Sequence, residues 1–102
     1  MADEFDINRI DDVIHGRVRL GIMAVLAGVD SADFSTLKTR LQTTDGNLSV
    51  HLKKLEEAGY VRIDKRFVGR KPLTEVALTD PGRAAFIRYL DAMRALVDQG
   101  RE

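Results

Sequence analysis

The stretch that decides the fold is Thr44-Asp45-Gly46-Asn47-Leu48-Ser49-Val50-His51-Leu52-Lys53-Lys54-Leu55-Glu56-Glu57-Ala58-Gly59-Tyr60-Val61. Its leucines at 48, 52 and 55 recur at i, i+4 and i+7, the spacing that places them on one face of a helix. Thr44 can cap the first turn with its hydroxyl, and Gly59 can adopt the left-handed conformation that ends the last turn. The sequence therefore predicts a helix whose leucine face is buried and whose other side is exposed.

The exposed side of this helix carries residue types suited to double-stranded DNA. Asn47 can read a base edge, Gly46 allows close approach, and Val50 can contact a thymine methyl group. Lys53 and Lys54 follow and can meet phosphates. The alternative is an ordinary solvated helix face, because charged runs usually lie on the surface.

After Gly59 the hydrophobic period changes from that of a helix to two. Val61 and Ile63 alternate with polar residues, and so do Thr74, Val76 and Leu78, which predicts two antiparallel strands with one buried face. The connector 65–72 contains four cations around a glycine. Three of these cations are expected to contact phosphate or the minor groove: Arg66, Arg70 and Lys71. The alternative is that they only keep an exposed hairpin soluble.

A shorter helix is expected before the turn Gln42-Thr43-Thr44. Ser35 is its expected cap, and Leu37 and Leu41 form its apolar face, with Lys38 and Arg40 on or near the exposed side. Together with the helix that follows, it forms a predicted helix-turn-helix over 35–59.

Several single residues next to these two helices also have expected roles. Thr43 and Thr44 can donate hydroxyls to a phosphate, or Thr44 can act as a cap alone. Phe34 is expected in the core, in a short strand that joins the wing sheet. His51 lies on the inner edge of the helix and is interpreted as a packing residue rather than a base reader.

The first third of the chain predicts a supporting helix or helix pair over 8–28, preceded by a frayed tail at 1–5. The apolar positions run at steps of four, and His15-Gly16 interrupts them and can divide the segment in two. Gly21 is expected to permit close packing against the helix that follows Thr44. Asp11 and His15 are one turn apart but lack a third ligand, so an acidic start to the helix is the preferred interpretation over a metal or acid–base site.

A long last helix is expected over 80–99, with Asp80 as its cap and Pro81 at its first position. At 1.5 Å per residue it spans about 28 Å, more than a small domain can cover. A second copy of the chain is the expected partner of its surplus apolar surface, although the helix could also fold back on its own domain. The residues predicted at this dimer interface are Phe5, Ile10, Phe86, Tyr89, Leu90, Met93, Leu96 and Val97.

From about Ile10 to Val97 the chain resembles the winged helix-turn-helix transcription regulators of the ArsR and MarR kind, most closely a small single-domain branch. The resemblance is strongest over 48–61, with secondary matches in Arg17-Val18-Arg19-Leu20-Gly21-Ile22 and Leu78-Thr79-Asp80-Pro81-Gly82-Arg83. It implies that the helix 45–59 is the recognition helix, that Ser49 contacts the DNA backbone, and that the helix carrying Lys38 crosses the phosphates. It also implies a homodimer joined through the terminal helices. The thiolate ligands of the metal-sensing branch are absent.

Composition places limits on the function. The 102 residues include 16 Lys and Arg, 16 Asp and Glu, and no cysteine, so neither a disulfide framework nor a thiolate metal site is possible. The net charge is −4 for residues 1–33, where three Lys and Arg stand against seven Asp and Glu. It is +5 for residues 34–71, with nine against four, and −1 for residues 72–102, with four against five. The positive third coincides with the expected DNA-binding part, and local potential is what governs affinity for nucleic acid. No membrane span or signal peptide is evident, so a cytoplasmic protein is expected.

These observations predict a single α+β domain over 1–102, mostly α: a winged helix-turn-helix with a two-stranded β-wing over 60–79 and a long C-terminal helix for dimerisation. The expected function is that of a transcriptional regulator, a homodimer on a short inverted repeat in double-stranded DNA. The alternatives are a protein-binding winged helix without DNA affinity and a regulator with a small-molecule effector site in the dimer cleft. No cofactor and no catalytic residue set is expected.

Overall fold

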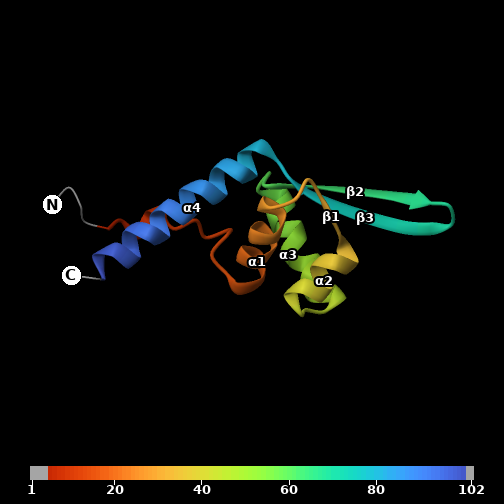
Figure 1. Cartoon of the computed structure of the whole chain (residues 1–102), viewed down its shortest axis with the longest axis horizontal. Coiled ribbons are helices and arrows are strands. Elements are labelled where there is room, and N and C mark those ends of the chain that lie inside the picture. The colour runs from red at the N-terminus through yellow and green to blue at the C-terminus, as the bar shows by residue number, and fades with distance from the viewer. Residues whose placement is uncertain (1–4, 101–102) are drawn as a thin grey trace.

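The computed structural model describes residues 5–100 of the chain, so most of the predicted tail, residues 1–4, lies outside the described part. Three helices form the centre, a β-hairpin projects from one end, and a long helix from the other (Figure 1). The helices are α1 (Arg17–Ala27), α2 (Phe34–Leu41), α3 (Asp45–Glu57) and α4 (Asp80–Gln99), and the strands are β1 (Ala32–Asp33), β2 (Val61–Val68) and β3 (Lys71–Leu78). The predicted fold class, mostly α with a β-wing, is confirmed.

The leucine face of α3 is the centre of the core. Leu48 and Leu55 are fully buried and Leu52 almost so, against Ile22 of α1 and Leu37 of α2. Burying side chains of this size contributes roughly 1.5–3 kcal/mol each, which fixes the face of α3 that points inward. Thr44 caps α3 by accepting from the Asn47 N–H at 3.1 Å, as expected.

The N-terminal segment differs from the predicted helix or helix pair over 8–28, although the expected break at His15-Gly16 is present. Residues 7–9 form a single 3-10 turn, and a regular helix begins only at Arg17. Between them Asp11 Oδ1 accepts the backbone N–H groups of Val13 and Ile14, which holds a turn in place of a helix. The apolar period persists because Ile14 is buried in the core in spite of the turn.

Three local predictions about the helices, two on caps and one on packing, are wrong in detail. Asp33, not Ser35, caps α2, and Thr79, not Asp80, caps α4, so each helix begins one or two residues earlier than expected. Gly21 does allow close packing, but its neighbour is Leu41 of α2 rather than α3. A side chain at position 21 would meet Leu41 Cδ2 at 2.7 Å.

The wing is the β2–β3 hairpin, and its strands are longer than predicted. They pair from Val61 opposite Leu78 out to Val68 opposite Lys71, which leaves a turn of only Gly69 and Arg70. Gly69 has φ +63, the left-handed region that glycine adopts without strain. A short third strand joins the wing sheet, as expected, but it is formed by Ala32 and Asp33, which pair with β3 in the strand order β1-β3-β2. Phe34 follows that strand as the first residue of α2 and is half-buried.

The helix α4 leaves the body of the domain, as its length predicts, and lies beside the N-terminal segment (Figure 1). Phe5 donates its backbone N–H to Gln99 Oε1 at 2.9 Å, so this residue of the predicted frayed tail is held. The radius of gyration is 15.5 Å, against about 13 Å for a compact domain of 100 residues. The molecule is therefore elongated, with the wing and the far half of α4 at opposite ends.

No helix within residues 5–100 is long and apolar enough to cross a membrane.

Candidate nucleic-acid interface

The outer ridge of α3 carries the residues predicted to face DNA. Gly46, Val50 and Lys53 follow one another at helical spacing and are all exposed, and Val50 retains 55% of its surface. A Cβ placed at Gly46 would meet no atom of the protein within 4 Å, so a ligand can approach the backbone there. Lys54 is exposed on the flank nearer α1.

The base-reading candidate Asn47 is exposed but already has an internal partner. Its Nδ2 donates to Thr43 Oγ1 at 2.8 Å, while Thr44 Oγ1 is used by the Asn47 backbone N–H. The amide of Asn47 keeps its carbonyl oxygen and one N–H for another molecule. The capping role of Thr44 is therefore present, and the phosphate role of Thr43 and Thr44 stays a prediction.

A groove of about 840 Å³ separates α3 from the wing. Ser49 and Lys53 line its helix side, while Lys65 and Thr74 line its wing side. Two carboxylates, Asp45 and Glu56, also border it; Asp45 is paired with Lys38 at 2.9 Å. This ion pair is exposed and contributes less than about 1 kcal/mol to stability, so an anionic ligand can compete for Lys38.

The wing's strand alternation divides its cations between two faces. Val61, Ile63 and Lys65 share one parity, and this is the face that borders the groove. Arg66 has the other parity and lies on the reverse face, in an ion pair with Glu75. The expected contact of Arg66 with phosphate or the minor groove stays a prediction, but its side chain lies on the face of the wing away from α3. Lys65 takes the groove-facing position.

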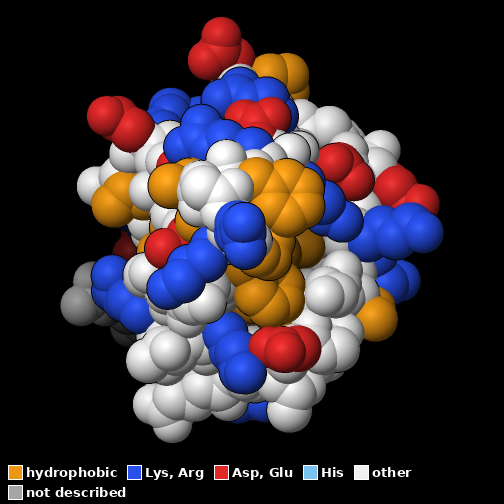
Figure 2. Space-filling model, turned by 90° about the vertical axis from the view of Figure 1, so that its right-hand side faces the viewer, with side chains coloured by type: hydrophobic (Ala, Val, Ile, Leu, Met, Phe, Trp, Pro, Cys, Tyr) orange, Lys and Arg blue, Asp and Glu red, His pale blue; other side chains and the backbone are white. Residues whose placement is uncertain are grey.

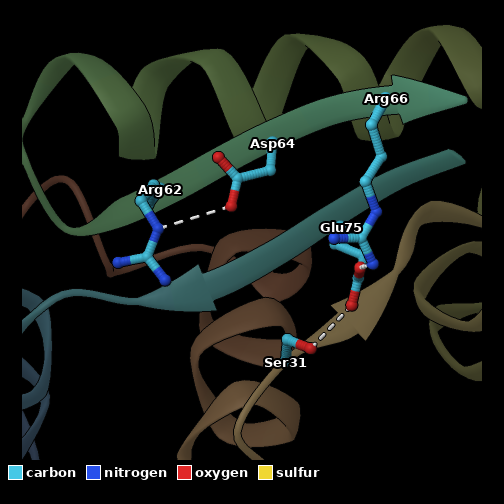
Figure 3. A network of polar contacts seen from close by, with 5 residues as sticks. All are labelled: Ser31, Arg62, Asp64, Arg66 and Glu75. Atoms are coloured by element: carbon cyan, nitrogen blue, oxygen red, sulfur yellow. Dashed lines mark hydrogen bonds and ion pairs between the residues drawn. The ribbon is translucent and has the colours of Figure 1, made fainter.

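The reverse face of the wing is a network of internal polar contacts (Figure 3). Glu75 accepts from Ser31 Oγ at 2.9 Å as well as from Arg66, and Arg62 lies 3.5 Å from Asp64. These contacts connect β2 and β3 to the segment that precedes β1. Lys65 is not among the predicted contacts because position 65 falls in the predicted loop 65–72, where side chains do not alternate between two faces. Position 65 is in β2, and continuing the alternation from Val61 would have placed Lys65 on the same face as Ile63.

Arg70, in the turn, and Lys71, the first residue of β3, lie at the exposed tip of the wing. In the view onto this tip, Lys and Arg side chains surround a hydrophobic patch, with a few acidic side chains among them (Figure 2). The wing tip thus presents positive charge at the end of the molecule opposite the far end of α4 (Figure 1).

His51 is a packing residue, as expected, and its contact fixes its protonation. Arg19 Nη1 lies 2.9 Å from His51 Nδ1, and Arg19 Nε donates to the Val13 carbonyl. Because a guanidinium only donates, Nδ1 accepts and the ring proton of neutral His51 is on Nε2. Burial, then the charges of Arg19 and Lys54, lower the pKa of His51.

Asp11 and His15, which lie one turn apart in the sequence, each form a hydrogen bond with a tyrosine. Tyr60 donates its hydroxyl to Asp11 Oδ2 at 2.5 Å, and burial together with this carboxylate raises the pKa of Tyr60 to about 12. His15 Nδ1 lies 2.8 Å from the Tyr89 hydroxyl, whose pKa is raised by burial. Within residues 5–100, no three His, Asp or Glu side chains are placed to hold a metal ion together.

The predicted dimer residues on α4 fall into two groups. Phe86 and Tyr89 are buried in the core of their own chain, so they are not available to a partner. Leu90, Leu96 and Val97 keep 47%, 39% and 58% of their surfaces exposed, while Met93 is half-buried. Phe5 and Ile10 are half-buried on the N-terminal segment beside α4.

The profile of the winged helix DNA-binding domain family matches residues 18–97. The chain belongs to this family. It is 41% identical over 78 residues to the uncharacterized protein MJ0432 of Methanocaldococcus jannaschii. The matched region covers 76% of this chain and 85% of that protein.

Two solved structures of regulators share the fold. A transcriptional regulator homologue of Pyrococcus horikoshii OT3 is 33% identical, covers 97% of each chain and has a TM-score of 0.84. A MarR-family transcriptional regulator of Silicibacter pomeroyi is 26% identical, with a TM-score of 0.68 over 90% of this chain and 61% of that one. The fold is therefore that of a winged-helix transcriptional regulator of the MarR-like kind.

Proposed function

We propose that this protein is a transcriptional regulator that binds a short inverted repeat in double-stranded DNA as a homodimer. The observation that carries the proposal is the groove between α3 and the wing. Its two walls present Ser49 and Lys53 on one side and Lys65 and Thr74 on the other. These hydroxyl and ammonium donors suit a phosphate strand, which would lie between the recognition helix and the wing.

The contacts then divide by kind. With the N-terminal half of α3 in the major groove, Gly46, Asn47 and Val50 would face base edges, because they form its exposed surface. Lys38, Thr43, Thr44 and Lys54 would surround that contact on the phosphates, and Arg70 and Lys71 would extend it along the duplex. Each good base contact is worth about 1–3 kcal/mol of discrimination.

The dimer rests on the exposed apolar surface of α4. Leu90 and Val97 lie on the part of the helix that projects away from the wing, where they leave the recognition surface free. A two-fold axis at this end would place two α3 helices on successive major grooves, about 34 Å apart. The inverted repeat follows from that symmetry.

The direct test is selection of bound duplexes from a random-sequence pool, followed by titration of the enriched duplex at two salt concentrations. We expect a two-fold symmetric motif and an affinity that falls steeply with salt, since several cations meet phosphates. A protein that retains its fold but enriches no motif and binds no duplex at low salt would exclude the proposal and favour a protein-binding winged helix.

A further inference from the structure

Phe67 is the most exposed large hydrophobic residue in the described part of the chain, with 72% of its surface free. Its neighbour Val68 is 60% exposed, and both lie beside the turn Gly69-Arg70 at the wing tip. A single exposed apolar residue is ordinary on a protein surface. An aromatic ring near the end of a projecting hairpin, with Lys65, Arg66, Arg70 and Lys71 close to it in the sequence, is less so.

Strand parity gives the direction in which Phe67 points. Phe67 shares the face of Ile63 and Lys65, which line the groove beside α3, whereas Val68 shares the reverse face of Arg66. The ring is therefore on the side of the wing that continues the proposed DNA surface. Its partner across the hairpin on that face is Pro72.

The charges around Phe67 indicate a polyanion with an apolar interior. Residues 65–72 contain four cations and no carboxylate. Within the described residues, Lys65, Arg70 and Lys71 form no ion pair with a carboxylate, whereas Arg66 is paired with Glu75. The minor groove of DNA offers this combination, because two phosphate strands border a floor of stacked bases. Within the described part of the chain, Phe67 and Val68 are the large exposed hydrophobic residues at the tip, with Pro72 beside them, which is little apolar surface for insertion into a lipid interface.

The dimensions agree with a contact in the minor groove. Phe67 lies four residues beyond Ile63, the last half-buried residue of β2, so at about 3.3 Å per residue it is about 13 Å out from the body. That is enough to pass one phosphate strand from a major-groove site. A two-stranded ribbon is too wide for a minor groove of about 6 Å, but a phenyl ring is not.

We propose that Phe67 is a wedge that enters the minor groove, partly unstacks one base step and bends the duplex. The inference rests on the proposed function. A wedge of this kind favours steps that unstack easily, so the bound sequence is expected to carry a TA or CA/TG step where the wing tip meets it. The wing then selects sequence through deformability, without hydrogen bonds to bases.

The test compares Phe67→Ala with Val68→Ala, which truncates the exposed neighbouring side chain on the reverse face, on the duplex enriched by the wild-type protein. Bending is measured by energy transfer between dyes at the duplex ends, and unstacking by 2-aminopurine fluorescence at the expected step. We expect Phe67→Ala to abolish most of the bend and the fluorescence change and to weaken binding about tenfold or more, as for loss of a buried ring. Val68→Ala should leave all three unchanged, and Phe67→Leu should keep part of the bend, since leucine also acts as a wedge.

The salt dependence separates this role from a phosphate contact. Phe67→Ala should leave the salt slope unchanged because it removes no cation. If Phe67→Ala weakens binding but the bend and fluorescence persist, the ring is a surface contact and the wedge is wrong. If neither variant changes binding or bend, the wedge is wrong while the proposed function stands. If the wild-type protein binds no duplex, both fall together.

Discussion

At the scale of single residues, Arg66 and Arg70 are four positions apart on the wing and have opposite surroundings. Arg66 is paired with Glu75 on the reverse face, whereas Arg70 lies in the exposed turn. We expect Arg70→Ala to weaken binding to all duplexes alike and to lower the salt slope by about one, the effect of one lost phosphate contact.

Arg66→Ala is the matched control for that prediction, since it removes the same side chain from the same hairpin. It should leave the salt slope as in the wild-type protein, with binding titrated at four salt concentrations for each variant. A lower slope for Arg66→Ala and an unchanged slope for Arg70→Ala would reverse the assignment of the two faces.

His51 gives a second residue-scale prediction, on stability against pH. Its pKa is lowered in the folded protein, so below pH 6.5 the unfolded chain binds more protons at this position than the folded chain does. The stabilising contribution is therefore present above pH 6.5 and is lost as the pH falls below it. His51→Asn keeps an acceptor near the position of Nδ1 for Arg19 but does not titrate, so it should lack this part of the acid loss.

The measurement is the free energy of unfolding from urea titrations of both proteins at pH 8, 7, 6 and 5. From about pH 6.5 downward, the wild-type value should fall more steeply with decreasing pH than that of His51→Asn. If the free energies of unfolding of the two proteins changed in parallel with pH, the surroundings of His51, including Arg19, would not disfavour its protonated form.

Residue placement also shows where sequence reasoning is strong and where it fails. The inward face of α3 follows from three leucines, because burial of that face outweighs every local preference. The placement of Arg66 and Lys65 could not be read correctly once the strands were assumed to end at position 64. A loop has no fixed alternation, so an error in strand length changes which cation faces the groove.

At the scale of elements, periodicity predicted the existence of the helices better than their ends. Over 8–28 the apolar spacing continues through a turn, because Ile14 is buried whether or not its backbone is helical. The decisive contacts there are the two N–H groups accepted by Asp11 and the hydroxyl of Tyr60, which comes from 49 residues away. A contact so distant in sequence has no local signal.

The junction of α3, β2 and α4 yields an element-scale prediction at Gly82. A Cβ there would lie 1.9 Å from the Tyr60 carbonyl oxygen, so the two backbones could not remain in place. Gly82→Ala should lower the free energy of unfolding by about 1–3 kcal/mol, the cost typical of overpacking. Replacement of a glycine by alanine within a helix usually raises the free energy of unfolding, so the expected effect at Gly82 has the opposite sign.

Gly46→Ala is the control, because Gly46 also lies in the first turn of a helix but has no atom within 4 Å of the added Cβ. It should raise the free energy of unfolding by about 0.5–1 kcal/mol. Both variants are measured by urea denaturation. Gly82→Ala as stable as the wild-type protein would mean that α4 can shift away from Tyr60 at little cost.

At the scale of the whole molecule, the 59 Å length separates two surfaces with different expected partners. The wing and α3 form the basic end, and α4 with the N-terminal segment forms the end with exposed leucine and valine side chains (Figure 1). The net positive charge of residues 34–71, which include α3 and most of the wing, predicted the basic end. Because the two ends are formed by different residues, we expect that the proposed dimerisation and the proposed DNA contact can be altered separately.

The double variant Leu90→Glu and Val97→Glu tests that separation. Two carboxylates on the exposed face of α4 should oppose association without disturbing the core, because both positions are already in solvent. We expect a dimer for the wild-type protein and a monomer for the variant in sedimentation equilibrium. Affinity for the inverted repeat should fall by a hundredfold or more, on the order of the gain from linking two binding sites, while affinity for a single half-site should change little.

Val68→Glu serves as the control, because it adds a carboxylate at an equally exposed position on the opposite end of the molecule. It should leave the sedimentation mass that of the wild-type dimer, whatever it does to DNA binding. If the α4 variant stays dimeric while Val68→Glu becomes a monomer, the two-fold axis passes through the wing and not through α4. In that arrangement the two recognition helices could not lie on successive major grooves, and the inverted repeat would be excluded with it.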